Sequence, residues 1–225
     1  AGMPVDMDGT IQADGSILAT RIAVYDTNTS GASFWAGPLV FVSASQSILR
    51  MAPILEEGPI GVSGPAQLSF SKAAFQVSGQ IDNLQGLPFT ANFTASNMVA
   101  GQNIFLTTHG QALNTGPILA YISTITLMPQ TINGTVSAIG SSGGFTTYTV
   151  TLASYDLFPQ FAVQPGQTTL LTNPSQVVVY ADDNTQMLNT NPIAVGSVVR
   201  FYGLVFNDNG ALRMDCAQIN DGVPE

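Results

Sequence analysis

The stretch VGSVVRFYGLVFNDNGALRMDCAQI, residues 195–219, contains the pattern that decides the fold. Apolar residues recur at alternate positions on both sides of NDNG, residues 207–210, and such alternation is typical of a β-strand with one buried face. Asn209 and Gly210 supply the positive φ angles that a tight hairpin turn requires. The stretch therefore predicts two antiparallel strands joined by a short turn. Gly203, in the middle of the first strand, predicts a bulge or sharp bend there.

The same outline occurs at the start of the chain, in AGMPVDMDGTIQADGSILATRI, residues 1–22. Gly2 and Gly9 keep the spacing of the two glycines in the later copy, which has one residue inserted at its turn. A third, looser copy begins at Gly101, and we assign its mid-strand glycine to Gly110. The chain therefore contains an internal repeat built on a hairpin.

Helical periodicity is almost absent, and short β-branched and aromatic runs alternate with turn residues, so the chain is predicted to be all-β. Two glycine-centred strands, FQVSGQIDN (residues 75–83) and TINGTVSAI (residues 131–139), precede the second and third hairpins. We therefore expect two β modules, at residues 73–130 and 131–225. Residues 1–72 are expected to form an N-terminal β region that holds the first hairpin and an irregular insert.

The strands VSGQI and INGTV, together with the hairpins of residues 1–22 and 195–219, resemble a bacterial family of domains of unknown function. That family consists of tandem small OB-like β-barrels in secreted and envelope proteins. The resemblance covers most of the chain outside residues 27–71, and it implies tandem OB-like barrels or sandwiches at the cell surface or outside the cell. Many relatives look like lipoproteins whose mature chain begins with cysteine, whereas this chain begins with Ala1, which fits removal of a leader.

Charge is scarce in this chain and its sign is negative. Charged residues make up 8% of 225 residues, and 5 Lys and Arg against 14 Asp and Glu give a net charge of −9. Because a phosphate backbone attracts clustered Lys and Arg, the composition predicts no nucleic-acid partner. Mean hydropathy is +0.26, yet no apolar run approaches the roughly 18 residues of a membrane helix, so no membrane span is expected. A surface of uncharged polar side chains suits a protein that packs against neighbours or lies outside the cell.

No catalytic constellation is evident in the sequence. His109 is the only histidine, so no second histidine is present for a metal pair or a proton relay. Cys216 is the only cysteine, and the alternation around it predicts a small buried hydrophobe. Phosphate-loop, zinc-finger and dinucleotide-binding motifs are all absent from the sequence. We therefore predict that the chain is not an enzyme, has no catalytic residue and takes no cofactor.

Short motifs suggest two kinds of surface ligand, a calcium ion and glycans. Asp182 and Asp183 are weak calcium candidates, because hard cations bind clustered oxygen atoms. Their segment does not continue into a complete calcium loop and reads more simply as a turn, so no metal is predicted. Sequons at Asn28, Asn92 and Asn133 allow glycans on surface loops.

A hairpin without the rest of a barrel has unpaired edges, which invite pairing with another strand. Residues 37–43 of the same chain could cover it, or another copy could. The hypothesis we favour is a structural subunit of an extracellular filament or sheath, a homopolymer formed by strand addition. Its subunit interface would include Met3, Val5 and Met7. The alternative is a monomeric envelope module that binds carbohydrate or protein, for which the aromatic stretch YDLFPQF, residues 155–161, is the best candidate patch.

Overall fold

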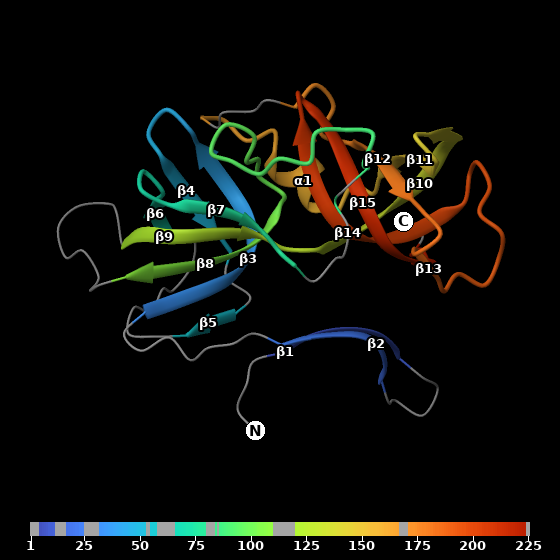
Figure 1. Cartoon of the computed structure of the whole chain (residues 1–225), viewed down its shortest axis with the longest axis horizontal. Helices are drawn as coiled ribbons and strands as arrows, with labels where there is room; N and C mark the ends of the chain where they lie inside the picture. Colours follow the sequence, from blue (N-terminus) through green and yellow to red (C-terminus); the bar gives the residue numbers. More distant parts are fainter. Residues whose placement is uncertain are drawn as a thin grey trace.

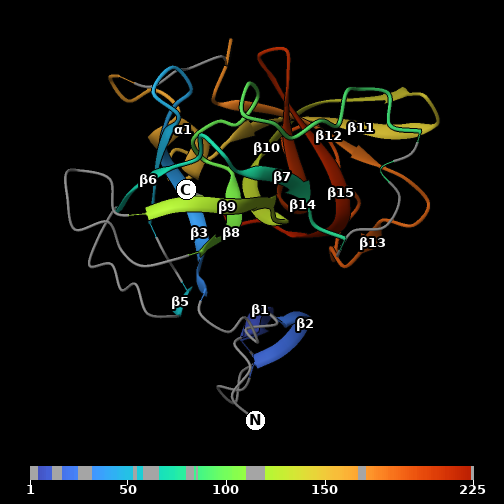
Figure 2. The same cartoon turned by 60° about the vertical axis from the view of Figure 1, so that its left-hand side comes forward.

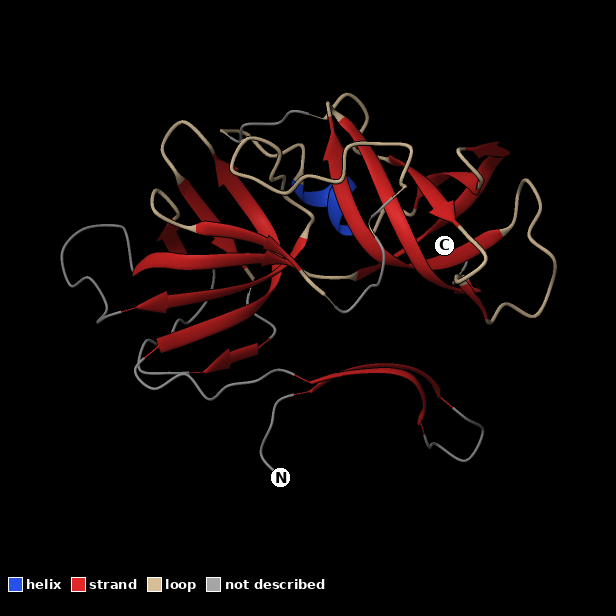
Figure 3. Ribbon diagram, viewed as in Figure 1, coloured by secondary structure: helices blue, strands red, loops and turns tan. Residues whose placement is uncertain are grey.

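A computed structural model of the chain describes residues 5–11, 17–24, 32–52, 55–57, 66–79, 84, 86–109, 120–166 and 171–223. These residues form strands and one short helix, α1 (Leu157–Phe161), as Figure 3 shows. The strands are β1 (Val5–Ile11), β2 (Ile17–Val24), β3 (Ala32–Ser43), β4 (Ile48–Met51), β5 (Leu55–Glu57), β6 (Ala66–Ser69), β7 (Ala74–Val77), β8 (Asn103–His109), β9 (Ala120–Leu127), β10 (Gln130–Ser142), β11 (Phe145–Leu152), β12 (Gln176–Ala181), β13 (Gln186–Met187), β14 (Val198–Asp208) and β15 (Ala211–Asp221).

Strands β10, β11, β12, β15 and β14 pair in that order, and β14 pairs again with β10, so they close a ring. The pairing of β12 with β15 is parallel and the others are antiparallel. Alternating side chains of β11 fill the interior, where Tyr148, Val150 and Leu152 are buried. This five-stranded Greek-key barrel is the OB-like fold. We call it the second ring.

Strands β3, β4, β6, β9 and β8 close a first ring with the same order and the same directions, because β6 and β9 are parallel. Outside it β7 runs parallel to β9, as β13 runs parallel to β15 in the second ring. Strand β5 is an addition that pairs with β3. Figures 1 and 2 show the two rings side by side. The expected all-β fold with OB-like barrels is confirmed.

The two rings correspond residue by residue along their first strands. In β3, Gly37 pairs with Ile104, and a bulge begins two residues later. In β10, Gly134 pairs with Val199, and a bulge again begins two residues later. The first strand of the first ring is therefore β3.

The boundary predicted at residue 73 is wrong, because three strands that precede it, β3, β4 and β6, belong to the first ring. Residues 75–83 were expected to open that ring. Instead β7, which covers the start of this segment, lies outside β9. The sequence misled because Pro38 in β3 suggests a break in a strand, whereas here it lies beside a bulge, where proline is tolerated.

Strand β14 connects the two rings because both of its faces are buried. Val205 packs in the core of the second ring, while Leu204 and Phe206 join the core of the first. The side chain of Gln102, which is 0% exposed, adds a polar link: its Nε2 donates to the carbonyl oxygen of Val205 at 3.0 Å. Only Met128 and Pro129 separate β9 from β10. The rings therefore share one strand, β14, as a common wall.

Within the part of the chain that the structure describes, no helix has the length and apolar character needed to cross a bilayer. The hairpin of β1 and β2 lies to one side of the rings in Figure 1.

A glycine substitution tests the close approach between the backbones of β14 and β15 at Gly203. A Cβ atom on Gly203 would overlap the carbonyl oxygen of Asp215, and backbone cannot move aside as a side chain can. We expect Gly203→Ala to lower the free energy of unfolding by about 1–3 kcal/mol, the usual cost of overpacking, in urea titrations followed by circular dichroism. Gly79→Ala is the matched control, because a Cβ there meets no atom within 4 Å. Equal stability of the two variants would contradict the expectation.

Candidate functional site

The N-terminal hairpin is a third copy of the hairpin that closes each ring. A bulge interrupts β1 and β2 at Gly9, β8 and β9 at Thr108, and β14 and β15 at Gly203. All three bulges lie at the same distance from the leading glycine of their copy. The expected bend at the mid-strand glycine is confirmed for Gly9 and Gly203. In the middle copy the counterpart is Thr108, not Gly110, which lies outside the described residues.

The hairpin forms a two-stranded sheet of its own. Among the described strands, β1 and β2 pair only with each other. Of the predicted interface residues, Val5 pairs with Val24 and Met7 with Ile22, so both occupy the same face of the ribbon. Met3 lies outside the described residues. The role of these residues in an interface stays a prediction.

The suggestion that residues 37–43 cover this hairpin is wrong. They form the second half of β3, which pairs with β8 and β4 inside the first ring. Residues 37 and 38 pair with β8 and residues 39–43 with β4, while β1 and β2 pair only with each other among the described strands. Residues 37–43 therefore do not pair with β1 or β2.

A second open edge occurs at the far end of β10. Its pairing with β14 ends at Thr135, and Val136 still bonds to residues just before β14. From Ser137 to Ser142, β11 is the only described strand that pairs with β10. This segment is exposed and includes Ile139, which is 43% exposed. We call it the β10 edge.

A polar cleft of about 540 Å³ lies between the rings. Its lining is composed of Thr90, Asn92, Thr94, Ser96 and Asn97 from the segment between β7 and β8, which packs on the core of the first ring, and Asn207, Asp208, Asn209 and Gly210 from the turn between β14 and β15. We call it the inter-ring cleft.

The first wall of the inter-ring cleft follows from a simple alternation. In FTANFTASN, residues 89–97, apolar side chains pack on the core while the residues between them face the cleft. Phe93 and Met98 are buried anchors. Asn97 fixes the end of the segment, because its Oδ1 accepts from the Thr94 hydroxyl at 2.9 Å and its Nδ2 donates to the Asn92 carbonyl oxygen at 2.6 Å.

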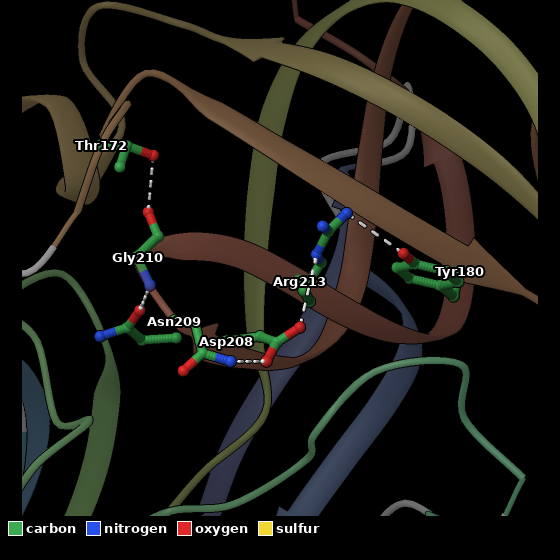
Figure 4. A network of polar contacts seen from close by, with 7 residues as sticks. Thr172, Tyr180, Asp208, Asn209, Gly210 and Arg213 are labelled. Carbon is green, nitrogen blue, oxygen red and sulfur yellow. Dashed lines mark hydrogen bonds and ion pairs between the residues drawn. The ribbon is translucent and has the colours of Figure 1, made fainter.

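The second wall is a turn held by polar contacts, shown in Figure 4. The carbonyl oxygen of Gly210 accepts from the backbone N–H of Thr172 at 2.8 Å and from its hydroxyl at 3.0 Å. Asp208 accepts from Asn209 at 3.0 Å and lies 3.9 Å from the Arg213 guanidinium. Arg213 in turn donates to the Tyr180 hydroxyl at 3.2 Å. Both walls are therefore fixed by contacts within the protein.

Two buried carboxyl groups lie in the second ring. Burial raises the pKa of Asp156 to about 6, although its oxygens accept from the backbone N–H groups of Asn133 and Phe158. Burial, and then the nearby charge of Asp182, raise the pKa of Asp215 to about 6. The Oδ2 atom of Asp215 has no hydrogen-bond partner in the described part of the chain.

The weak calcium candidates form a turn. Oδ1 of Asp182 accepts from the backbone N–H groups of Asn184 at 2.9 Å and Thr185 at 3.1 Å, while Asp183 is exposed. Among the described residues, no three His, Cys, Asp or Glu side chains come together as metal ligands do.

The other residues singled out from the sequence are separated in the structure. Cys216 is 5% exposed, and burial raises the pKa of its thiol. His109 ends β8, on the first ring. In the aromatic stretch Phe158 is 0% exposed and belongs to the core, while Tyr155 is 47% exposed and its hydroxyl donates to the Val223 carbonyl oxygen.

The glycan prediction needs correction at one sequon. Asn133 is 7% exposed inside β10, and its Nδ2 donates to the Tyr155 hydroxyl and the Val223 carbonyl oxygen. An amide buried in this way is not accessible to a glycan. Asn92 is exposed at the inter-ring cleft, and Asn28 lies outside the described residues.

No protein-family model matches this chain. No curated protein sequence matches it either. One solved structure that it matches is a deletion mutant of the single-stranded DNA binding protein from Thermus aquaticus, at 13% identity and a TM-score of 0.26, over 86% of this chain and 95% of that one. The class that the structure defines is a chain of tandem OB-like barrels, and this rests on the strand pairing described above.

The exclusion of nucleic acid as a partner is corrected. It rested on charge alone, and the matched structure is named as a DNA-binding protein. We therefore withdraw the exclusion. At this TM-score the likeness does not show what the present chain binds.

The inter-ring cleft was missed in the sequence because its two walls are more than a hundred residues apart. The alternation in residues 89–97 is a local signal that could have identified one wall. Nothing local indicates that the turn of residues 207–210 faces it.

Asp156 predicts a pH dependence of stability. Its pKa in the folded protein, about 6, lies above the ordinary value of 3.8, so the folded state binds the proton more tightly than the unfolded state. This contribution is fully present below about pH 4 and is lost as the pH rises through about 6. At 1.36 kcal/mol per pKa unit, the loss is about 3 kcal/mol.

Urea unfolding at intervals across this pH range measures the slope. We expect Asp156→Asn to reduce the slope without abolishing it, because an amide does not ionise, whereas Asp215, whose pKa is also raised to about 6, still does. Asp183→Asn controls for the loss of one negative charge at an exposed position. An unchanged slope in Asp156→Asn would show that burial of this carboxyl group does not set the dependence.

Proposed function

We propose that this chain is a structural subunit of an extracellular bacterial assembly, a filament or sheath, and that it self-associates by β-strand addition. The observation that carries the proposal is the hairpin of β1 and β2. It repeats the closing hairpin of both rings, bulge included, yet among the described strands it has no ring to close.

An unpaired hairpin favours association on energetic grounds. Each residue along an outer edge presents N–H or C=O groups that bond to water or to another strand. A two-stranded ribbon alone is marginally stable in water, and additional strands stabilise it. In each ring the equivalent hairpin pairs on both sides, with a first strand and with a third strand.

The β10 edge is the acceptor in this proposal. Its residues, 137–142, carry no charge and no proline, which are the usual protections of an exposed edge. Its length is close to those of β1 and β2. A second copy of the chain is the occupant that we propose, since the chain itself supplies the hairpin.

The location outside the cell belongs to the same proposal. It is supported by the low content of charged residues, 8%, and by the resemblance to tandem barrels of bacterial secreted and envelope proteins. Because donor and acceptor are different surfaces, the contact is head-to-tail and propagates unless it closes into a circle. A structural role needs no catalytic residue, and we propose none.

Removal of the donor, which is the hairpin of β1 and β2, is the first test of the proposal. We expect the full chain to form concentration-dependent assemblies in analytical ultracentrifugation and electron microscopy, and a chain lacking residues 1–24 to remain monomeric. Ile139→Lys, which places a charge on the β10 edge, should also prevent assembly. Val163→Lys, at a residue that is 60% exposed and outside any strand, should not. A monomeric full chain, or unchanged assemblies after the deletion, would contradict the proposal.

Mixing the two defective chains is the second test. Ile139→Lys retains the donor hairpin, and the chain lacking residues 1–24 retains the acceptor edge. Together they should form a heterodimer that cannot grow, because each end of the pair is blocked. If the mixture yields only monomers, the β10 edge is not the acceptor.

A further inference from the structure

We infer that the inter-ring cleft is a binding site for a neutral carbohydrate. The inference does not depend on the proposed assembly, because none of the residues that line the cleft belongs to β1, β2 or the β10 edge. It rests on the shape of the cleft, on the kind of side chain that lines it and on the rigidity of both walls.

The dimensions suit a small ligand. A volume of about 540 Å³ falls within the range of about 300–1,000 Å³ that is usual for ligand sites. The cleft lies where the two rings meet, and junctions between domains are frequent places for such sites. Leu204 and Phe206 hold the rings together beside it, so its width is fixed by a shared core.

The lining selects among ligand classes by its chemistry. All of its side chains are hydroxyls, amides or a single carboxylate, and none is apolar or cationic. An apolar ligand would find no apolar side chain there, and the polar groups that line the cleft would lose water without gaining partners. An anion would find Asp208 and no free cation, because Arg213 already contacts Asp208 and Tyr180. A hard cation would find only one carboxylate, so the lining offers little negative charge to hold it.

A neutral polyol is the class that remains. Hydroxyl and amide groups donate and accept hydrogen bonds, as do sugar hydroxyls. Within the described part of the chain, no hydrogen bond uses the hydroxyl of Thr90 or the side-chain amide of Asn92, and both side chains are exposed to the cleft. These groups can therefore bind a ligand without breaking a contact of the protein.

Preorganisation supports the same conclusion. The contacts of Asn97 fix one wall, and the contacts of Asp208 and Gly210 fix the other, so the walls do not have to be ordered when a ligand enters. The groups that fix the walls differ from the groups that we assign to the ligand. Substitutions of Thr90 and Asn92 should therefore weaken binding without unfolding the walls.

Saturation-transfer NMR on the full chain tests the inference, and it works for monomers and large assemblies alike. The probes are neutral oligosaccharides built from glucose, mannose, galactose or N-acetylglucosamine, with a uronic-acid oligosaccharide as the anionic comparison. We expect transfer to at least one neutral oligosaccharide. Thr90→Val and Asn92→Ala should each weaken its affinity about tenfold, the effect of one lost hydrogen bond.

Two further variants complete the test. Ser96→Trp, which fills the cleft from an exposed position, should abolish transfer, while Asn191→Ala, at an exposed amide on another loop, should leave it unchanged. Absence of transfer to every neutral oligosaccharide overturns the inference. So does transfer to the uronic-acid oligosaccharide alone, or transfer that survives Ser96→Trp.

Discussion

Closure of a five-stranded ring depends on one bent hairpin. Its first strand must pair with the strand that opens the ring, and its second must run parallel to the third strand, which places the two partners on opposite sides of the barrel. A straight ribbon cannot reach both. The extra residue at the bulge turns the hairpin, and at Gly203 the absence of a side chain lets the backbone of Asp215 come close. The rest of the ring, and the packing of one ring on the other, follows from that bend.

The need for a bent hairpin in each ring also bears on the N-terminal hairpin of β1 and β2. A sequence that specifies a bent, bulged ribbon specifies a shape that suits a ring, and the bulge in β1 and β2 has no evident use in an isolated ribbon. The hairpin is therefore matched to strands that it does not find in the described part of the chain. A hairpin shaped for a ring, without a ring around it in the described part of the chain, is the observation that points most directly to function.

The sequence predicted the fold class and the closing hairpins because both depend on short-range patterns. Alternation and turn residues such as Asn209 and Gly210 are local. It did not predict where the first ring begins, because Pro38 in β3 reads as a strand break, and only pairing with β8 shows that the strand continues. It also missed the inter-ring cleft, which exists only because β14 brings residues 207–210 against residues 90–97. Strand order is a long-range property, so a local pattern cannot decide between β3 and β7 as the opening strand.

Burial of both faces of β14 has a mechanical consequence. Leu204 and Phe206 belong to the first ring and Val205 to the second, and Gln102 is bonded to the strand between them. A pulling force that extracts β14 therefore disrupts both barrels, because it removes core side chains from both at once. In the filament that we propose, tension that reaches this strand would make the two rings yield together.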